Sequence, residues 1–179
     1  MASTAAEETV RRGRPGYDRE QVLTVAVNLF NERGYDATSV ADLAKRLGLS
    51  KSALYHHFSS KEELLELALD EALTSLERIL TGWPAAHQGS AAAQLAYVIR
   101  GAVRVLIEKL PYVTLLLRVR GNSPIEAAAV ARRRAFDHDV GRVVLAAQEE
   151  GLLRNDVDAA VATRLIFGMI NSLTEWYRP

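Results

Sequence analysis

The chain of 179 residues contains no cysteine. Disulfides, thiol nucleophiles and zinc sites with thiolate ligands are therefore excluded, and a reducing compartment suits the sequence. Long hydrophobic runs are also missing, because the longest, at residues 110–117, is too short to cross a bilayer. The first sixteen residues lack the apolar segment of a secretory signal. We therefore expect a protein of the cytoplasm.

Several enzyme signatures are absent as well. The sequence has no HExxH, no phosphate-binding P-loop, no GxGxxG and no GxSxG. His87 falls in a predicted loop, and His138 stands between Asp137 and Asp139 on a predicted helix, where a solvated face is the simpler interpretation. An enzyme is therefore the weaker alternative, and we expect no catalytic residue, no metal site and no cofactor.

Net charge is zero, from 22 basic and 22 acidic residues, but the charges are unevenly distributed. Residues 11–61 hold nine Lys or Arg and five Asp or Glu, which gives +4. Residues 62–179 hold thirteen and fifteen, which gives −2, and Glu7 and Glu8 supply the remaining −2. A mildly basic first third on a mildly acidic body suits a module that faces nucleic acid, although the bias is small.

Helical periodicity runs through the chain from Tyr17, with no sustained period-2 alternation and no hairpin turn signal. The sequence therefore predicts an all-α fold. Residues 81–90, TGWPAAHQGS, are expected to form a loop. The expected helices cover residues 18–33, 39–48, 50–57, 60–80, 91–109, 111–119, 125–150 and 157–176.

Helix ends are well marked in the first third. Gly34 and Gly48 are expected to end the first two helices. Ser39 with Asp42, and Ser60 with Glu63, have the spacing of capping boxes at the starts of two others.

The segment LGLSKSALYHHFSSK, residues 47–61, has helix signals at both ends but few apolar residues. Two helices joined through Gly48 have the length and chemistry of a helix-turn-helix. The apolar positions expected to face inward are Leu43, Leu47, Leu49, Leu54 and Phe58. The positions left facing outward are Lys51, Ser52, Ala53, Tyr55, His56 and His57.

These outward groups suit a DNA major groove, which a short helix can enter with its N-terminal end. Lys and Ser can hydrogen-bond base edges or phosphates, and Ala can touch a thymine methyl. Thr38 and Ser39 stand at a helix start, where free N–H groups can bind a phosphate, and Lys61 could hold the backbone nearby.

Other interpretations remain open for this segment. His56 and His57 could bind a metal, but adjacent helical residues point about 100° apart and no third ligand has the right spacing. Tyr55 could be a half-buried packing residue, and Lys51 could be merely solvated. The whole segment could also be an ordinary surface helix of a bundle.

The run from Arg33 to Leu64 closely resembles the DNA-binding domain of the tetracycline repressor (TetR) family. The matching positions are Gly34-Tyr35, Thr38, Val40, Asp42-Leu43-Ala44, Gly48-Leu49-Ser50, Leu54-Tyr55, His57-Phe58, Lys61 and Leu64. The tail, from Gly168-Met169-Ile170-Asn171 to Trp176-Tyr177, is similar to the last-helix motif of many members. Members usually continue into a further helix, so whether one completes the dimer interface is left open.

The resemblance implies a homodimeric, ligand-responsive transcriptional regulator, most often a repressor released from a palindromic operator by a small molecule. Residues 1–16 are small, polar and then basic, and they are expected to form a flexible arm. The resemblance implies a helix-turn-helix DNA-binding domain at 17–60 and a helical ligand-binding and dimerisation domain at 61–179. The base readers carried over by position are Lys51, Ser52, Ala53 and His56. The phosphate contacts carried over are Thr38, Ser39, Tyr55, His57 and Lys61.

The basic arm RRGRPG, residues 11–16, resembles arginine arms that enter an A·T-rich minor groove. Arg14 is therefore a further DNA-binding candidate, and a solvated basic tail is the alternative.

Helices beyond residue 91 are apolar on more than one face, so some must meet each other and one pair should meet a second subunit. The expected dimer contacts, on the last two helices, are Val140, Val144, Ala147, Val161, Leu165 and Gly168. The expected ligand pocket is formed by Tyr97, Arg100, Gly101, Arg104, Tyr112, Leu116, Phe136 and Asn171.

Two questions about the partners stay open at this stage. The tail and the arginine-rich body are similar to relatives that respond to acyl- or aryl-CoA thioesters, which makes such a thioester the candidate effector. A DNA-binding architectural protein without a ligand is the alternative to a regulator.

Overall fold

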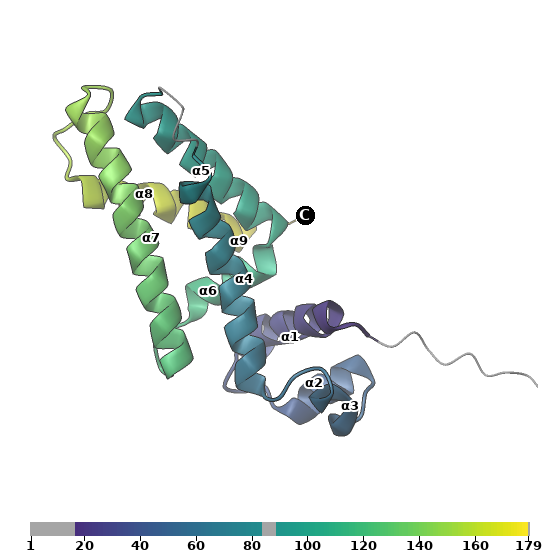
Figure 1. Ribbon diagram of the computed structural model, residues 1–179. Helices are drawn as coiled ribbons and strands as arrows, with labels where there is room; N and C mark the ends of the chain where they lie inside the picture. Colours follow the sequence, from purple (N-terminus) through teal and green to yellow (C-terminus); the bar gives the residue numbers. More distant parts are fainter. Residues whose placement is uncertain (1–16, 84–88, 179) are drawn as a thin grey trace, which may run out of the picture.

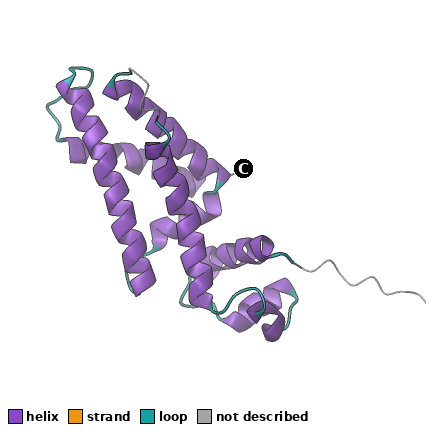
Figure 2. Ribbon diagram, in the orientation of Figure 1, coloured by secondary structure: helices purple, strands orange, loops and turns teal. Residues whose placement is uncertain are grey.

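The computed structural model describes residues 17–83 and 89–178, and these contain helices and no strand (Figures 1 and 2). The predicted all-α class is confirmed. The basic arm with Arg14, and residues 84–88 of the predicted loop, lie outside the described residues. In chain order the helices are α1 (Arg19–Arg33), α2 (Val40–Leu47), α3 (Lys51–Tyr55), α4 (Lys61–Thr81), α5 (Ala91–Glu108), α6 (Leu110–Arg118), α7 (Pro124–Glu149), α8 (Ala159–Asn171) and α9 (Leu173–Trp176).

The predicted boundaries agree with these within one residue, apart from two helices. The third ends at Tyr55, so that His56 and His57 lie in the turn that follows it. The last predicted helix starts only at Ala159, because the Asp158 carboxylate accepts the N–H groups of Ala160 and Val161. It is also divided at Ser172 into α8 and α9.

The first three helices form a small domain, the head, around the first turns of α4 (Figure 1). Gly48 ends α2 with a positive φ of 66°, a left-handed conformation that costs glycine little, and the chain turns there into α3. Ser39 and Asp42 form the predicted capping box. Ser60 caps α4 as predicted, but the Glu63 side chain accepts from Ser59 instead of completing a box with Ser60.

Long helix α4 continues from the head into the second part of the molecule, the body. There it packs against α5, α6 and α7, while α8 lies across α7 (Figure 1). One continuous apolar core runs from head to body, with Phe30 and Leu43 at one end and Val140 and Phe167 at the other. Within the residues described, no helix is long and apolar enough to span a membrane.

Candidate DNA-binding face and effector cavity

Helix α3 presents a polar face that no other part of the described chain covers. Leu54 and Phe58 are buried beneath it, so the opposite side is turned to solvent. Lys51, Ser52 and His56 are exposed on that side. Tyr55 is half exposed, which fits both a contact with DNA and the alternative of a half-buried packing residue. The exposed face predicted from the sequence is therefore present, with Ala53 and His57 partly exposed at its edges.

Thr38 does not belong to this face. Its side chain is 1% exposed, and its hydroxyl donates to the carbonyl oxygen of Gly34 at 2.7 Å. The expectation that Thr38 binds phosphate is therefore corrected, because its hydroxyl closes the turn between α1 and α2. Ser39 is exposed, but its hydroxyl caps α2 and donates to the Asp42 carboxylate at 2.5 Å.

Lys61 is also engaged within the protein. Its ammonium donates to the carbonyl oxygens of Tyr35 at 3.1 Å and Thr38 at 3.0 Å, and lies 4.1 Å from the centre of the Tyr35 ring. Lys61 therefore fastens α4 to the head. An ammonium group has three donors, so these two hydrogen bonds leave one for the predicted phosphate contact, which stays a prediction.

Arg19 and Glu63 hold the end of the α3 segment, residues 47–61, through contacts that sequence reasoning missed. The Arg19 guanidinium lies 5.0 Å from the Phe58 ring centre and 2.6 Å from the Glu63 carboxylate. The other Glu63 oxygen accepts from the backbone N–H and the hydroxyl of Ser59, each at 2.6 Å. These contacts join α1, the segment after α3, and α4.

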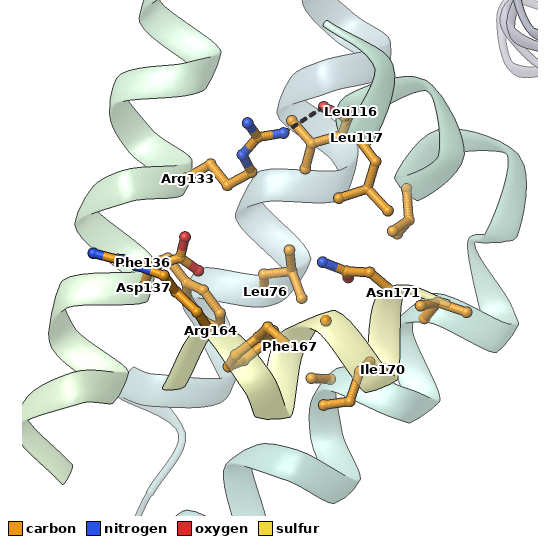
Figure 3. A pocket seen from close by; sticks show the side chains of 14 residues that line it. Leu76, Leu116, Leu117, Arg133, Phe136, Asp137, Arg164, Phe167, Ile170 and Asn171 are labelled. Carbon is orange, nitrogen blue, oxygen red and sulfur yellow. Dashed lines mark hydrogen bonds between the residues drawn. The ribbon is translucent and has the colours of Figure 1, made fainter. Parts of the chain in front are cut away.

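A cavity of about 330 Å³ lies in the body between α4, α5, α6, α7 and α8 (Figure 3). Most of its wall is apolar, with Phe136 and Phe167 meeting edge to face at a centroid distance of 5.5 Å. The full lining is Leu76, Ala102, Leu106, Val113, Leu116, Leu117, Arg133, Phe136, Asp137, Arg164, Phe167, Gly168, Ile170 and Asn171.

Four polar side chains interrupt this apolar wall: Arg133, Asp137, Arg164 and Asn171 (Figure 3). Arg133 donates to the carbonyl oxygen of Leu116 at 3.1 Å, near the end of α6. Burial raises the pKa of the Asp137 carboxyl, and the nearby guanidinium groups of Arg133 and Arg164 oppose that rise. An apolar cavity with a few convergent polar groups is the usual form of a small-molecule site.

Three of the eight residues predicted for the pocket line this cavity, namely Leu116, Phe136 and Asn171. The other five do not. Tyr97 contacts the Gly82 carbonyl and the Trp83 ring instead. Tyr112 turns toward the head, where its hydroxyl lies 3.1 Å from that of Thr24.

The remaining three corrections concern α5. Arg100 and Arg104 line a separate surface groove on its outer side. Gly101 packs against Ile79 so closely that a Cβ would lie 2.7 Å from its Cγ2. The face of α5 that meets the cavity carries Ala102 and Leu106, whereas the arginines lie on its outer face and Gly101 faces α4. Sequence reasoning missed Arg133, Asp137, Arg164 and Phe167, although the four-residue spacing of Arg133 and Asp137 places them on one side of α7.

The predicted dimer contacts divide into two groups. Val140, Val144 and Ala147 are fully buried inside one chain, so they are corrected from dimer contacts to core residues. Val161, Leu165 and Gly168 are exposed on α8. We call the exposed apolar side chains of α7 and α8 the stripe; it consists of Leu145, Val161, Leu165 and Met169.

Comparison with known proteins agrees with this layout. A family model described as bacterial regulatory proteins of the tetR family matches residues 22–68. A second, described as a tetracyclin repressor-like C-terminal domain, matches residues 88–179.

Individual proteins match over nearly the whole chain. A solved TetR-family regulator, SCO3833 from Streptomyces coelicolor A3, is 50% identical with a TM-score of 0.85, over 96% of this chain and 85% of that one. The transcriptional repressor KstR2 of Rhodococcus jostii is 27% identical, over 100% of this chain and 87% of that protein. The structure of AibR in complex with isovaleryl coenzyme A and operator DNA shares the fold, at 22% identity and a TM-score of 0.75, over 90% of this chain and 87% of that one.

Proposed function

Because the chain belongs to the tetR family of bacterial regulatory proteins, we propose that it is a dimeric transcriptional repressor that leaves a palindromic operator when a small molecule fills its cavity. It is a regulator and not an enzyme. The observation that carries the proposal is the joint presence of an uncovered α3 face and a largely apolar cavity on one continuous core. The cavity favours a ligand-responsive regulator over an architectural DNA binder. The cytoplasm is the compartment in which such a protein would meet DNA.

We assign base reading to Lys51, Ser52, Ala53 and His56, the positions that the family resemblance indicates. All four are exposed or partly exposed on α3 and the turn that follows it. We expect Tyr55, His57 and the exposed Ser39 to contact the sugar-phosphate backbone. Two such heads about one DNA turn apart would read a palindrome.

The proposed base readers can be tested by selecting bound DNA fragments from random or genomic sequence and then measuring affinity for the selected site. Lys51→Ala should weaken that affinity about tenfold or more, since a good base contact contributes roughly 1–3 kcal/mol. Arg78→Ala removes the same charge from the exposed surface near the end of α4 and should change affinity less than twofold. Equal losses in the two variants would show that α3 does not read the operator.

For the effector we propose an acyl- or aryl-CoA thioester. An acyl or aryl group suits the wall around Phe136 and Phe167, and Arg133 and Arg164 can face an anion. AibR shows that the fold can accommodate a CoA ester, but its low identity makes it an example of the fold alone. A panel of CoA thioesters should raise the melting temperature of the protein. If no member of the panel raises the melting temperature, the proposal of a CoA thioester is wrong. The proposal that the cavity binds a small molecule is then unaffected.

Two helices link the cavity to the head, and a change in the cavity when a ligand binds can reach the head through either of them. The first is α4, which contributes Leu76 to the cavity and is fastened to the head by Lys61. The second is α6, which contributes Leu116 to the cavity. It reaches α1 through the Tyr112–Thr24 hydroxyl contact and through Asn31, whose amide donates to the Pro111 carbonyl at 2.8 Å.

We propose that the effector stabilises a state in which α4 carries the two heads of the dimer apart. Moving the population from 1:99 to 99:1 requires the ligand to prefer the released state by about 5.5 kcal/mol. Because the chain has no cysteine, single spin labels can be introduced cleanly on the heads. Their separation should increase on effector binding, and an unchanged separation would contradict this mechanism.

A further inference from the structure

A surface groove of about 310 Å³ runs between α4 and α7, which lie side by side in the body (Figure 1). It shares no residue with the effector cavity. Six of its lining residues are apolar, and the other four, three carboxylates and one guanidinium, give a net charge of −2. We call it the acidic groove; its lining is Glu63, Glu66, Leu67, Leu69, Asp70, Leu73, Ile125, Ala128, Ala129 and Arg132.

The three carboxylates of the acidic groove stand on one face of α4, because Glu63, Glu66 and Asp70 are three and four residues apart. The outer two have arginine partners. Arg19 lies 2.6 Å from Glu63 at the head end, and Arg132 lies 2.7 Å from Asp70 at the other end. Glu66 is exposed between them, and the described part of the chain gives it no ion-pair partner. Since like charges one helical turn apart repel each other, a cation at Glu66 would be stabilising.

The basic arm is the occupant whose charge and length fit the acidic groove. It carries three arginines within residues 11–14. It is followed closely by Arg19, whose guanidinium already lies at the head end of the groove. The five residues from Arg14 to Arg19 can span up to about 17 Å, whereas Glu66 lies only about 5 Å beyond Glu63 along α4. The arginines of the arm can therefore reach Glu66.

The mixed lining of the acidic groove also suits arginine. Leu67, Ile125 and Ala128 are at least partly exposed there, beside the carboxylate of Glu66. The aliphatic part of an arginine side chain can cover such apolar surface while its head stays in a polar environment. Its planar guanidinium can then form two parallel hydrogen bonds with a carboxylate.

We propose that residues 11–14 bind in the acidic groove when DNA is absent, with an arginine of the arm paired with Glu66. The arm then has two alternative sites, this groove and the minor groove of the operator. An arm held in the acidic groove is not free for DNA, so the apparent affinity for the operator falls with the fraction of molecules whose arm is free. This consequence for DNA rests on the operator binding proposed above, whereas the docking of the arm does not.

The absence of cysteine allows the docking to be measured in the full chain, without DNA, by disulfide formation. Gly13→Cys places one thiol in the arm, and Ala128→Cys places another at an exposed position of the groove. The control pairs Gly13→Cys with Ala127→Cys, the exposed neighbour that does not line the groove. With a mild oxidant, the intramolecular disulfide should form about tenfold faster in the first pair than in the control, because docking raises the effective concentration of the thiols. Glu66→Lys should slow the first pair about fivefold.

Three outcomes would overturn the docking of the arm. Equal rates in the two cysteine pairs would show that the arm does not occupy the acidic groove. A rate that Glu66→Lys leaves unchanged would show that no ion pair with this carboxylate holds the arm. A disulfide that joins two chains, seen as a doubled mass on a denaturing gel, would show that the groove takes the arm of another copy.

The competition with DNA is tested with Glu66→Gln, which removes the charge and keeps the shape of the side chain. In the full chain it should lower the Kd for the operator about threefold at low salt, because more of the arm is free. In a chain that lacks residues 1–15, the same change should alter the Kd less than about 1.5-fold, which separates docking from a general effect of charge near DNA. Equal gains in the two chains would contradict the competition. If neither chain binds any selected DNA, the proposed function fails and the disulfide result still stands.

Discussion

At the scale of single residues, Glu126 shows how one buried carboxylate organises a turn. Its Oε2 accepts the backbone N–H groups of Arg120, Gly121 and Asn122 at 3.0, 2.9 and 3.0 Å. Burial raises the pKa of Glu126, but these three hydrogen bonds outweigh burial and leave the pKa below its ordinary value of 4.5. The ionised form therefore stabilises the fold, and it fixes the link between α6 and α7 at the bottom of the body.

Replacing Glu126 with Gln should lower the free energy of unfolding by about 2 kcal/mol at pH 7, because hydrogen bonds to a charged group are the stronger ones. Since the pKa is lowered in the folded state, the contribution is complete above pH 4.5 and is lost as pH falls through the folded value. Urea unfolding at pH 7 and pH 3 should therefore show a difference between the two proteins that shrinks in acid. Glu149→Gln, exposed on α7, should stay within about 0.5 kcal/mol of the parent at both pH values.

At the scale of helices, Arg132 joins α7 to α4 across two turns. Its guanidinium donates to both carboxylate oxygens of Glu77 at 2.8 and 2.7 Å, to Asp70 at 2.7 Å and to Thr74 at 3.2 Å. The hydrogen bonds to Glu77, the largest cause, and to Asp70 raise the pKa of Arg132 and keep it charged. The geometry uses the planar fork of arginine, which lysine cannot reproduce.

Arg132→Met should therefore destabilise the protein by about 1 kcal/mol, a small value because the side chains are partly exposed and screened by solvent. Chemical denaturation should also show that the loss becomes smaller at high salt. Arg142→Met is the matched control on the same helix, since its contact with Asp139 is 3.8 Å long and exposed. A loss as large in the control as in Arg132→Met would mean that the network has no special role.

At the scale of the whole molecule, the basic arm adds to the head a second possible contact with DNA. Deleting residues 1–15 removes Arg11, Arg12 and Arg14. If these enter the minor groove, operator affinity should fall and the slope of log K against log salt should become less steep by about 3. Fluorescence anisotropy across a salt series measures both quantities. Deleting residues 1–9 alone keeps the three arginines and should leave the slope unchanged, whereas an unchanged slope in the longer deletion would refute the arm.

Much of this architecture could be predicted from the sequence, because its signals are local. Gly48, Ser39 and Ser60 mark helix ends through their own backbone and side-chain chemistry, and these predictions were confirmed. The exposed face of α3 followed from its shortage of apolar residues. The cavity lining was harder to predict, because it depends on how α5 and α7 rotate about their axes. An amphipathic pattern with apolar residues on several sides leaves that rotation open.

The same limit explains the errors at Thr38 and Val140 and the internal contacts of Lys61 that sequence reasoning missed. Each side chain has a partner distant in sequence or an orientation set by tertiary packing. Lys61 finds the carbonyls of Tyr35 and Thr38 only after the head has folded. The sequence pattern alone allowed Val140 to lie at an exposed interface, but α4, α5 and α8 pack around α7 and bury it.

The hydrogen bonds from Lys61 to the carbonyl oxygens of Tyr35 and Thr38 join the head to the start of α4, so a tilt of α4 would move the head. Fifteen residues separate Lys61 from Leu76 at the cavity, and a rise of 1.5 Å per residue makes that span about 22 Å. A tilt of about 10° of α4 about Leu76 would therefore move its Lys61 end, to which the head is hydrogen-bonded, by about 4 Å. Successive base pairs are about 3.4 Å apart, so a small tilt beside a ligand would move the head by about the spacing of one base pair.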